Sequence, residues 1–175
     1  MSKKIEDYVI SIPDFPKPGI LFRDVTGVIG DPDGFRLAID ELCRRLEGVE
    51  FDLVAGMESR GFIFGAPLAC RLGKGFLPVR KPGKLPRETI SEDYDLEYGK
   101  ATLEIHKDDL KPGQKVVLVD DLLATGGTAA AAARLVGRLG GEVVKILFLI
   151  ELVDLGGRAR LSNYPVESIA GFPGH

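Results

Sequence analysis

One stretch, Val116 to Thr128, constrains the fold more than any other part of the chain. It opens with four apolar, mostly β-branched residues, which predict a strand buried on both faces. Two carboxylates, Asp120 and Asp121, follow at the end of this strand, and a turn of small residues leads into a helix expected over 129–139. This order makes an anion site, because the first backbone N–H groups of a helix lack partners within it and the helix dipole attracts negative charge.

The turn itself, Ala124 to Thr128, has residue types that suit a phosphate. Thr125 and Thr128 supply hydroxyl donors, and Gly126 and Gly127 let a phosphate approach the main chain without a Cβ in the way. The turn is not a nucleoside-triphosphate loop, because no Lys follows Gly127. The dinucleotide pattern G-x-G-x-x-G is also absent from the sequence.

The acidic pair indicates which phosphate ligand fits. A carboxylate repels a polyphosphate but accepts hydrogen bonds from sugar hydroxyls. We therefore expect Asp120 and Asp121 to hold a ribose while the turn holds the phosphate of the same sugar. The alternative is an ordinary strand–loop–helix unit with a solvated acidic pair.

Strands alternate with helices along the chain, which predicts an α/β fold with a mostly parallel, twisted central sheet flanked by helices. A helix that begins at Asp31 and Pro32 is expected before the first central strand. The 175 residues suffice for one domain with a full core. Central strands are expected at 51–55, 75–80, 116–119, 143–150 and 166–170. Ligands of such sheets bind beyond the carboxyl ends of the strands.

A second strand–turn–helix unit is predicted, and its strand also ends at the carboxyl edge of the sheet. Its turn, Gly56–Phe62, includes Ser59 and Arg60 just before a predicted helix. A pyrophosphate could rest on the first N–H groups of this helix, with the Arg60 guanidinium as a fork donor. A surface ion pair of Arg60 is the alternative.

A basic segment follows the next strand. Arg80 and Lys84 belong to a run with four cations in eight residues, in a chain of net charge −3. This local reversal of sign suits a polyanion such as pyrophosphate, and a solvated loop is the alternative. The segment continues to Gly99 without clear periodicity, which predicts a lid. Residues 101–105 alternate like a strand, so we expect a hairpin at the far end of the lid.

Prolines divide the N-terminal segment. Residues 3–11 read as a short amphipathic helix, and three prolines within 13–18 then force an extended path. The following stretch, Ile20–Thr26, would present backbone groups and one aromatic ring at a fixed position. An edge strand is the alternative.

Composition argues against several classes of partner and site. The negative net charge disfavours non-specific nucleic-acid binding. The sequence has no apolar run of about 18 residues, so no membrane-spanning helix is expected. The first residues lack the apolar core of a signal peptide, so a cytoplasmic location is expected. Cys43 and Cys70 fall in predicted helices, where we expect buried, reduced thiols. His106 and His175 are too far apart for a zinc cluster, and no direct protein ligand to a metal is expected.

The stretch 116–128 resembles the phosphoribosyl pyrophosphate motif of the type I phosphoribosyltransferases. Its Leu122-Leu123-Ala124 resembles the adenine-specific members in particular. The similarity spans nearly the whole chain. Residues 13–24, within an N-terminal segment 1–30, look like the base-recognition segment of that family, and 58–62 resembles its pyrophosphate loop. Residues 80–86 and 94–99, within 80–106, look like its flexible hood.

The resemblance implies one domain, 1–175, with the type I phosphoribosyltransferase fold. It implies transfer of the phosphoribosyl group from phosphoribosyl pyrophosphate to adenine, which gives AMP and pyrophosphate. It also implies Mg²⁺ bound through phosphoribosyl pyrophosphate, and a homodimer in which Arg80 reaches the pyrophosphate of the partner subunit. Ser59, Arg60 and Lys84 would bind pyrophosphate as well. The alternatives are a transferase for another purine, or a non-catalytic regulator that senses phosphoribosyl pyrophosphate.

The same resemblance assigns the base and the lid. Adenine has an N6 donor beside an N1 acceptor, which a backbone C=O and N–H around Phe22 and Arg23 can match while Phe22 stacks on the ring. A 6-oxo purine has the reverse polarity, and such a mismatch can give discrimination of roughly 10⁴. By the resemblance, Glu97 lies on the closed lid near the base and handles a purine proton.

Overall fold

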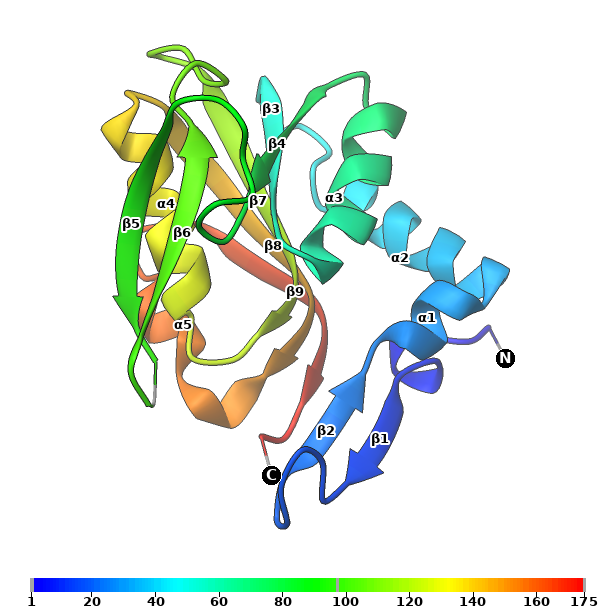
Figure 1. Cartoon of the computed structure of the whole chain (residues 1–175). Coiled ribbons are helices and arrows are strands. Elements are labelled where there is room, and N and C mark those ends of the chain that lie inside the picture. Colours follow the sequence, from blue (N-terminus) through cyan, green and yellow to red (C-terminus); the bar gives the residue numbers. More distant parts are fainter. Residues whose placement is uncertain (1, 97, 175) are drawn as a thin grey trace.

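The computed structural model describes residues 2–96 and 98–174, and its centre is a five-stranded parallel sheet (Figure 1). The strand order is β4-β3-β7-β8-β9, and every neighbouring pair is parallel. The strands are β3 (Leu53–Met57), β4 (Gly75–Val79), β7 (Lys115–Leu123), β8 (Glu142–Leu152) and β9 (Val166–Phe172). The predicted α/β class with a mostly parallel central sheet is confirmed.

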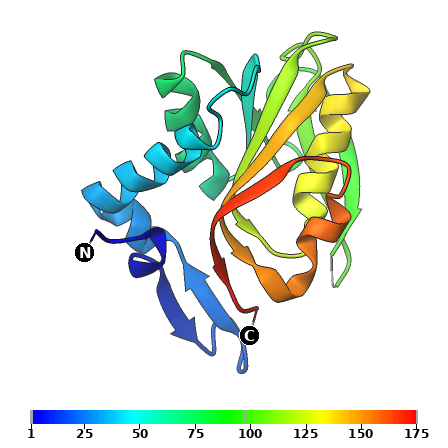
Figure 2. The ribbon, with the colours of Figure 1, turned by 180° about the vertical axis from the view of Figure 1, so that it is seen from behind.

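Helices cover both faces of the sheet (Figure 2). On one face lie α2 (Pro32–Arg44) and α3 (Arg60–Arg71), which bury residues such as Leu42 and Phe64 against Val54. On the other lies α4 (Gly127–Arg138), whose alanines pack against Leu118 and Phe148. The remaining helical segments are η1 (Ile5–Asp7), α1 (Thr26–Gly30), η2 (Val153–Leu155) and α5 (Gly157–Arg160).

The start of α2 follows the predicted capping signal. Asp31 accepts hydrogen bonds from the backbone N–H groups of Asp33 and Gly34, each at 2.9 Å. Pro32 occupies the first turn, where its missing N–H costs nothing. Such a cap stabilises a helix by about 1 kcal/mol.

The predicted helix over 3–11 is wrong. Only Ile5–Asp7 form a turn of 3₁₀-helix, closed by a 2.7 Å hydrogen bond from the Lys4 N–H to the Asp7 carboxylate. The chain then extends into β1 (Ile10–Pro13), which pairs antiparallel with β2 (Leu21–Asp24). Pairing across this N-terminal hairpin satisfies the backbone groups that a helix would have satisfied internally. Pro13 ends β1, and Pro16 and Pro18 lie in the turn, where their fixed φ angles disfavour a longer helix.

The lid contains more regular structure than the sequence indicates. Residues Thr89–Asp95 form β5, which pairs antiparallel with β6 (Lys100–His106) to make the hood hairpin. This hairpin packs on α4, where Glu92 accepts from the Arg134 Nε at 2.7 Å and from the Arg138 Nη1 at 3.1 Å. The far-end hairpin was predicted, but its first strand lacked a readable pattern, in part because the charged Glu92 lies on the face that binds α4.

Three smaller differences concern β7, β3 and the cysteines. Strand β7 continues through the acidic pair to Leu123, and α4 begins two residues earlier than predicted. Strand β3 begins and ends two residues later than predicted. Both cysteines lie in helices as free thiols, but Cys70 is exposed and Cys43 is half-buried. Among the described residues, no helix has both the length and the apolar character that crossing a membrane requires.

Candidate functional site

The phosphate turn, Ala124–Thr128, connects the carboxyl end of β7 to α4. Gly126 stands before the helix with φ +82°, a left-handed conformation that glycine adopts without a Cβ penalty. No described side chain caps this helix start. A hollow of about 70 Å³, lined by Asp120, Leu122, Leu123, Ala124, Thr125, Gly126, Gly127, Thr128, Ala129 and Phe148, lies inside the turn. This is several times the roughly 10–15 Å³ of such volume that one water needs, so the hollow has room for a small anion.

The acidic pair lies beside this hollow, and its two members differ in environment. Asp121 is 6% exposed and accepts a hydrogen bond from the Arg60 Nε at 2.5 Å. Asp120 lines the hollow and accepts from the Asp121 backbone N–H at 2.8 Å. Burial, followed by the negative charge of Asp121, raises the pKa of Asp120 well above the usual Asp range. The pair therefore offers one carboxylate held by a guanidinium and one that resists ionisation.

The start of α3 lies directly against the acidic pair. Gly61 makes this possible, because a Cβ there would lie 2.9 Å from the Asp120 Oδ1 and 3.1 Å from the Val119 carbonyl oxygen. Arg60, the first residue of α3, is thereby brought to Asp121, and exposed Ser59 precedes it. The ion pair that the sequence left as an alternative for Arg60 is formed, with a partner from the acidic pair itself.

Arg80 lies at the end of β4, beside the turn that leads into α3. Its Nε donates to the Glu58 Oε1 at 3.1 Å, and the Lys81 backbone N–H donates to the same oxygen at 2.8 Å. Burial alone would raise the pKa of Glu58, but these hydrogen bonds and the two cations outweigh it, and the pKa lies below the ordinary Glu value. The backbone of Arg80 also pairs with Glu104 of β6. Lys84 lies further along the segment and is exposed.

Sequence reasoning gave Glu58 no role, although the structure makes it the group that orients Arg80. The available signal was its position just before Ser59, opposite a basic segment in an otherwise acidic chain. Helix α5 was likewise given no role. A carbon placed on Gly126 would lie 2.8 Å from the Gly157 carbonyl oxygen, so α5 contacts the phosphate turn. No local pattern marks this contact, because α4 and β8 separate the two segments along the chain.

The predicted base-recognition residues lie on β2, in the N-terminal hairpin next to the end of β9 (Figure 1). The half-buried Phe22 ring meets Phe15 edge-to-face, with ring centroids 5.2 Å apart. The Arg23 Nη1 donates to the Ser11 Oγ at 2.5 Å, and its guanidinium lies 4.8 Å from the centroid of the Phe172 ring. The Arg23 side chain thus holds the N-terminal hairpin to the end of β9.

The loop of the N-terminal hairpin meets the tip of the hood hairpin. The Lys17 ammonium lies 5.8 Å from the centroid of the Tyr98 ring, which is 81% exposed. Both tips carry exposed apolar side chains, including Phe15 and Leu96. Glu97, the residue predicted to handle a purine proton, lies outside the described residues. In the described ranges, no three His, Cys, Asp or Glu side chains gather in a way that could hold a metal ion.

The chain is similar to known proteins along most of its length. The family description "Phosphoribosyl transferase domain" matches residues 36–169. The adenine phosphoribosyltransferase of Agathobacter rectalis is 63% identical over 172 residues, covering 98% of this chain and 99% of that protein. The adenine phosphoribosyltransferase of Escherichia coli O157:H7 is 57% identical, covering 98% of this chain and 94% of that protein.

Two solved structures extend the likeness to three dimensions. The adenine phosphoribosyltransferase of Thermoanaerobacter pseudethanolicus has a TM-score of 0.93 at 57% identity, covering 96% of this chain and 98% of that chain. The enzyme of Saccharomyces cerevisiae, whose structure contains adenine and an iminoaltritol bisphosphate, has a TM-score of 0.91 at 43% identity, covering 94% and 96%. The chain therefore belongs to the adenine phosphoribosyltransferases, within the phosphoribosyl transferase domain family.

Proposed function

We infer that the chain transfers the phosphoribosyl group from phosphoribosyl pyrophosphate to adenine, forming AMP and pyrophosphate in purine salvage. The observation that carries this function is the phosphate turn with an acidic pair beside it, at the carboxyl edge of a parallel sheet. A sensor without catalysis would need the same sugar-phosphate site. A sensor would not need the contact between the N-terminal hairpin and the hood hairpin that Lys17 and Tyr98 make.

The turn Ala124–Thr128 is proposed to bind the 5′-phosphate through the first N–H groups of α4 and the two threonine hydroxyls. The hollow inside the turn supports this assignment, because it has the size for one small anion and faces a helix start. Asp120 and Asp121 would accept hydrogen bonds from the ribose hydroxyls. The Asp121 carboxylate would also add negative potential that stabilises the cationic character that the sugar gains as the pyrophosphate leaves.

Ser59, Arg60, Arg80 and Lys84 are proposed to bind the pyrophosphate. The Arg60–Asp121 pair supports an exchange of partners, in which Arg60 moves to the pyrophosphate while Asp121 moves to the ribose hydroxyls. Each group would leave one charged or polar partner for another, so the buried Asp121 carboxylate would not be left unpaired. The Glu58 contact would keep the Arg80 guanidinium at the same edge.

Magnesium is proposed to bind through oxygens of phosphoribosyl pyrophosphate. Asp120 and Asp121 lie together at the same edge, where their oxygens could accept hydrogen bonds from the waters that such a hard cation retains. When bound, the ion would neutralise charge on the leaving pyrophosphate. The protein residues would orient the ribose and the pyrophosphate around it.

Adenine is proposed to bind to backbone groups of Phe22 and Arg23, with Phe22 stacking on the ring. The tethering of Arg23 to Ser11 and Phe172 supports a fixed β2 backbone at that place. Glu97 is proposed to handle a purine proton, a role that typically contributes about 10²–10⁴ to the rate. Closure of the hood would keep water from capturing the sugar cation.

The proposal includes a homodimer in which Arg80 reaches the partner's pyrophosphate. In that assembly Arg80 would exchange Glu58 of its own chain for the pyrophosphate of the neighbour. The single domain over 1–175 and the cytoplasmic location stay predictions. Light scattering of the purified chain tests the dimer.

A spectrophotometric assay with adenine, hypoxanthine, guanine and xanthine tests the function. We expect AMP formation from adenine and little product from the 6-oxo purines, and comparable rates with hypoxanthine would overturn the base assignment. Glu97→Gln should lower kcat by about 10²–10⁴ while the KM values change little. Glu50→Gln, an exposed carboxylate that pairs with Lys115 at the opposite end of β7, is the matched control. Near-normal turnover of Glu97→Gln would remove Glu97 from the chemistry.

A further inference from the structure

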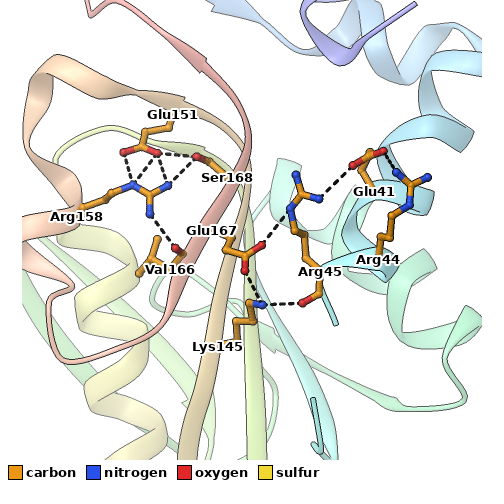
Figure 3. A network of polar contacts seen from close by, with 9 residues as sticks. All are labelled: Glu41, Arg44, Arg45, Lys145, Glu151, Arg158, Val166, Glu167 and Ser168. Carbon is orange, nitrogen blue, oxygen red and sulfur yellow. Dashed lines mark hydrogen bonds and ion pairs between the residues drawn. The ribbon is translucent and has the colours of Figure 1, made fainter. Parts of the chain in front are cut away.

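Helix α5 is anchored by a fork of hydrogen bonds that the proposed function does not use (Figure 3). The Arg158 Nε and Nη2 donate to the Glu151 carboxylate at 2.8–3.0 Å, and Nη1 donates to the Val166 carbonyl oxygen at 2.8 Å. Ser168 donates to the same carboxylate at 2.6 Å. Glu151 is 6% exposed, so its charge is buried and needs these partners. One side chain thereby ties α5 to both β8 and β9.

The anchored helix lies against the phosphate turn at three places. A Cβ on Gly157 would lie 2.5 Å from the Ala124 carbonyl oxygen, and one on Gly126 would lie 2.8 Å from the Gly157 carbonyl oxygen. A Cβ on Gly127 would lie 3.0 Å from the Arg160 Nη1. Backbone therefore meets backbone on both sides of this contact, and neither side can move toward the other.

We propose that Arg158 is a positioning residue for the phosphate turn, which it supports through Gly157 and Arg160 of α5. The inference rests on the proposed function, because it concerns the turn assigned to the 5′-phosphate. No described side chain caps the helix start to hold the shape of the turn, and its left-handed residue Gly126 lies against the Gly157 carbonyl of α5. A support on its outer side would hold the N–H groups in the orientation that a phosphate needs.

A second network on the same strand provides a matched control (Figure 3). Glu167 and Ser168 are consecutive residues of β9, so their side chains point to opposite faces of the sheet. Glu167 pairs with the Arg45 Nε at 3.0 Å and with the Lys145 Nζ at 2.9 Å, on the face that carries α2. This network ties the same strand to the end of α2, on the face of the sheet opposite the contact between Arg158 and Ser168. Loss of Arg45 should therefore cost stability without changing the turn.

The test compares Arg158→Lys with Arg45→Lys, each of which keeps the positive charge and loses the guanidinium contacts. For Arg158→Lys we expect the KM for phosphoribosyl pyrophosphate and the Kd for AMP to rise on the order of 10-fold to 100-fold. The KM for adenine, and kcat at saturating substrates, should stay near the wild-type values. Arg45→Lys should leave all of these constants unchanged, even where its melting temperature falls as much. An equal change in both variants would overturn the proposal.

Gly157→Ala tests the same contact without touching the Arg158 fork. Its new Cβ would press on the Ala124 carbonyl oxygen, so the same selective loss of phosphate affinity is expected even if Arg158→Lys does not fold. Wild-type affinity for AMP in Gly157→Ala would overturn the inference. A third variant, Gly126→Val, shows whether a negative result concerns only the role of Arg158 or also the phosphate site of the proposed function. If Gly126→Val abolishes AMP binding while both α5 variants bind normally, the phosphate site stands and only the role of Arg158 falls. If Gly126→Val binds AMP normally, the phosphate site and the inference fall together.

Discussion

Replacing Gly126 by Ala should test how tightly the phosphate turn is built, and Gly113→Ala is its natural comparison. Both glycines have a left-handed backbone, with φ +82° at Gly126 and +86° at Gly113. An L-residue in that conformation costs about 1–2 kcal/mol. The surroundings differ, because a Cβ at Gly113 meets nothing within 4 Å, whereas one at Gly126 lies 2.8 Å from the Gly157 carbonyl oxygen. Both variants share the backbone strain, and only Gly126→Ala adds a clash with main chain.

The clash sets the size of the expected difference. Overpacking against atoms that cannot rotate away costs about 1–3 kcal/mol. For a chain of 175 residues, each kcal/mol lowers the melting temperature by roughly 2–4 °C. Gly126→Ala should therefore melt about 2–12 °C below Gly113→Ala in differential scanning calorimetry. Isothermal titration with AMP should show weakened binding for Gly126→Ala and wild-type affinity for Gly113→Ala. Equal melting temperatures together with unchanged AMP affinity would refute the reasoning.

Three further outcomes follow from contacts at the site. Because the pKa of Asp120 is raised in the folded chain, the contribution of this group to the free energy of unfolding falls as pH rises above about 3.8. Urea unfolding across pH should show a weaker fall for Asp120→Asn than for the wild type, and identical profiles would contradict the raised pKa. Glu92→Gln should lower the free energy of unfolding by less than about 1 kcal/mol, because its partners Arg134 and Arg138 are about half exposed. Amide hydrogen exchange in β5 should nevertheless become faster, and unchanged exchange would mean that packing alone holds the hood hairpin on α4. Chelation of divalent cations should stop AMP formation and added Mg²⁺ should restore it, and full turnover in excess chelator would exclude the proposed magnesium role.

The parts of the fold that could be predicted are those whose signal is local. The run from Val116 to Thr128 predicts a strand, a turn and a helix start from adjacent residues, and the predicted bounds differ from the structure by only a few positions. The cap at Asp31 is equally local, since acceptor and donors lie within three residues. The first turn of the chain shows the limit of such signals. Its apolar spacing fits a helix, but pairing with β2 decides the outcome, and spacing along one segment carries no information about a partner strand.

The role of Arg23 shows a second limit. The residue type and its place after Phe22 do not reveal that its guanidinium packs on Phe172, which lies nearly 150 residues further along the chain. The support of the phosphate turn by α5 escapes prediction for the same reason. Gly157 and Gly126 are ordinary turn residues in sequence, and their close approach exists only because β8 returns the chain to the same edge.

The Arg60–Asp121 pair joins two motifs that the sequence offered separately. For Arg60, an ion pair and a role as pyrophosphate ligand were alternative predictions, and the 2.5 Å contact with Asp121 of the acidic pair makes the two compatible. The two residues are 61 positions apart, so neither motif alone could name the other as its partner. The parallel sheet brings them together by placing the ends of β3 and β7 side by side. Asp121 is buried and Arg60 is half exposed, so the Arg60 guanidinium is the member of the pair that can move away and remain hydrated. Binding of the pyrophosphate and release of Asp121 to the ribose would then be one coupled event, which requires both halves of the substrate.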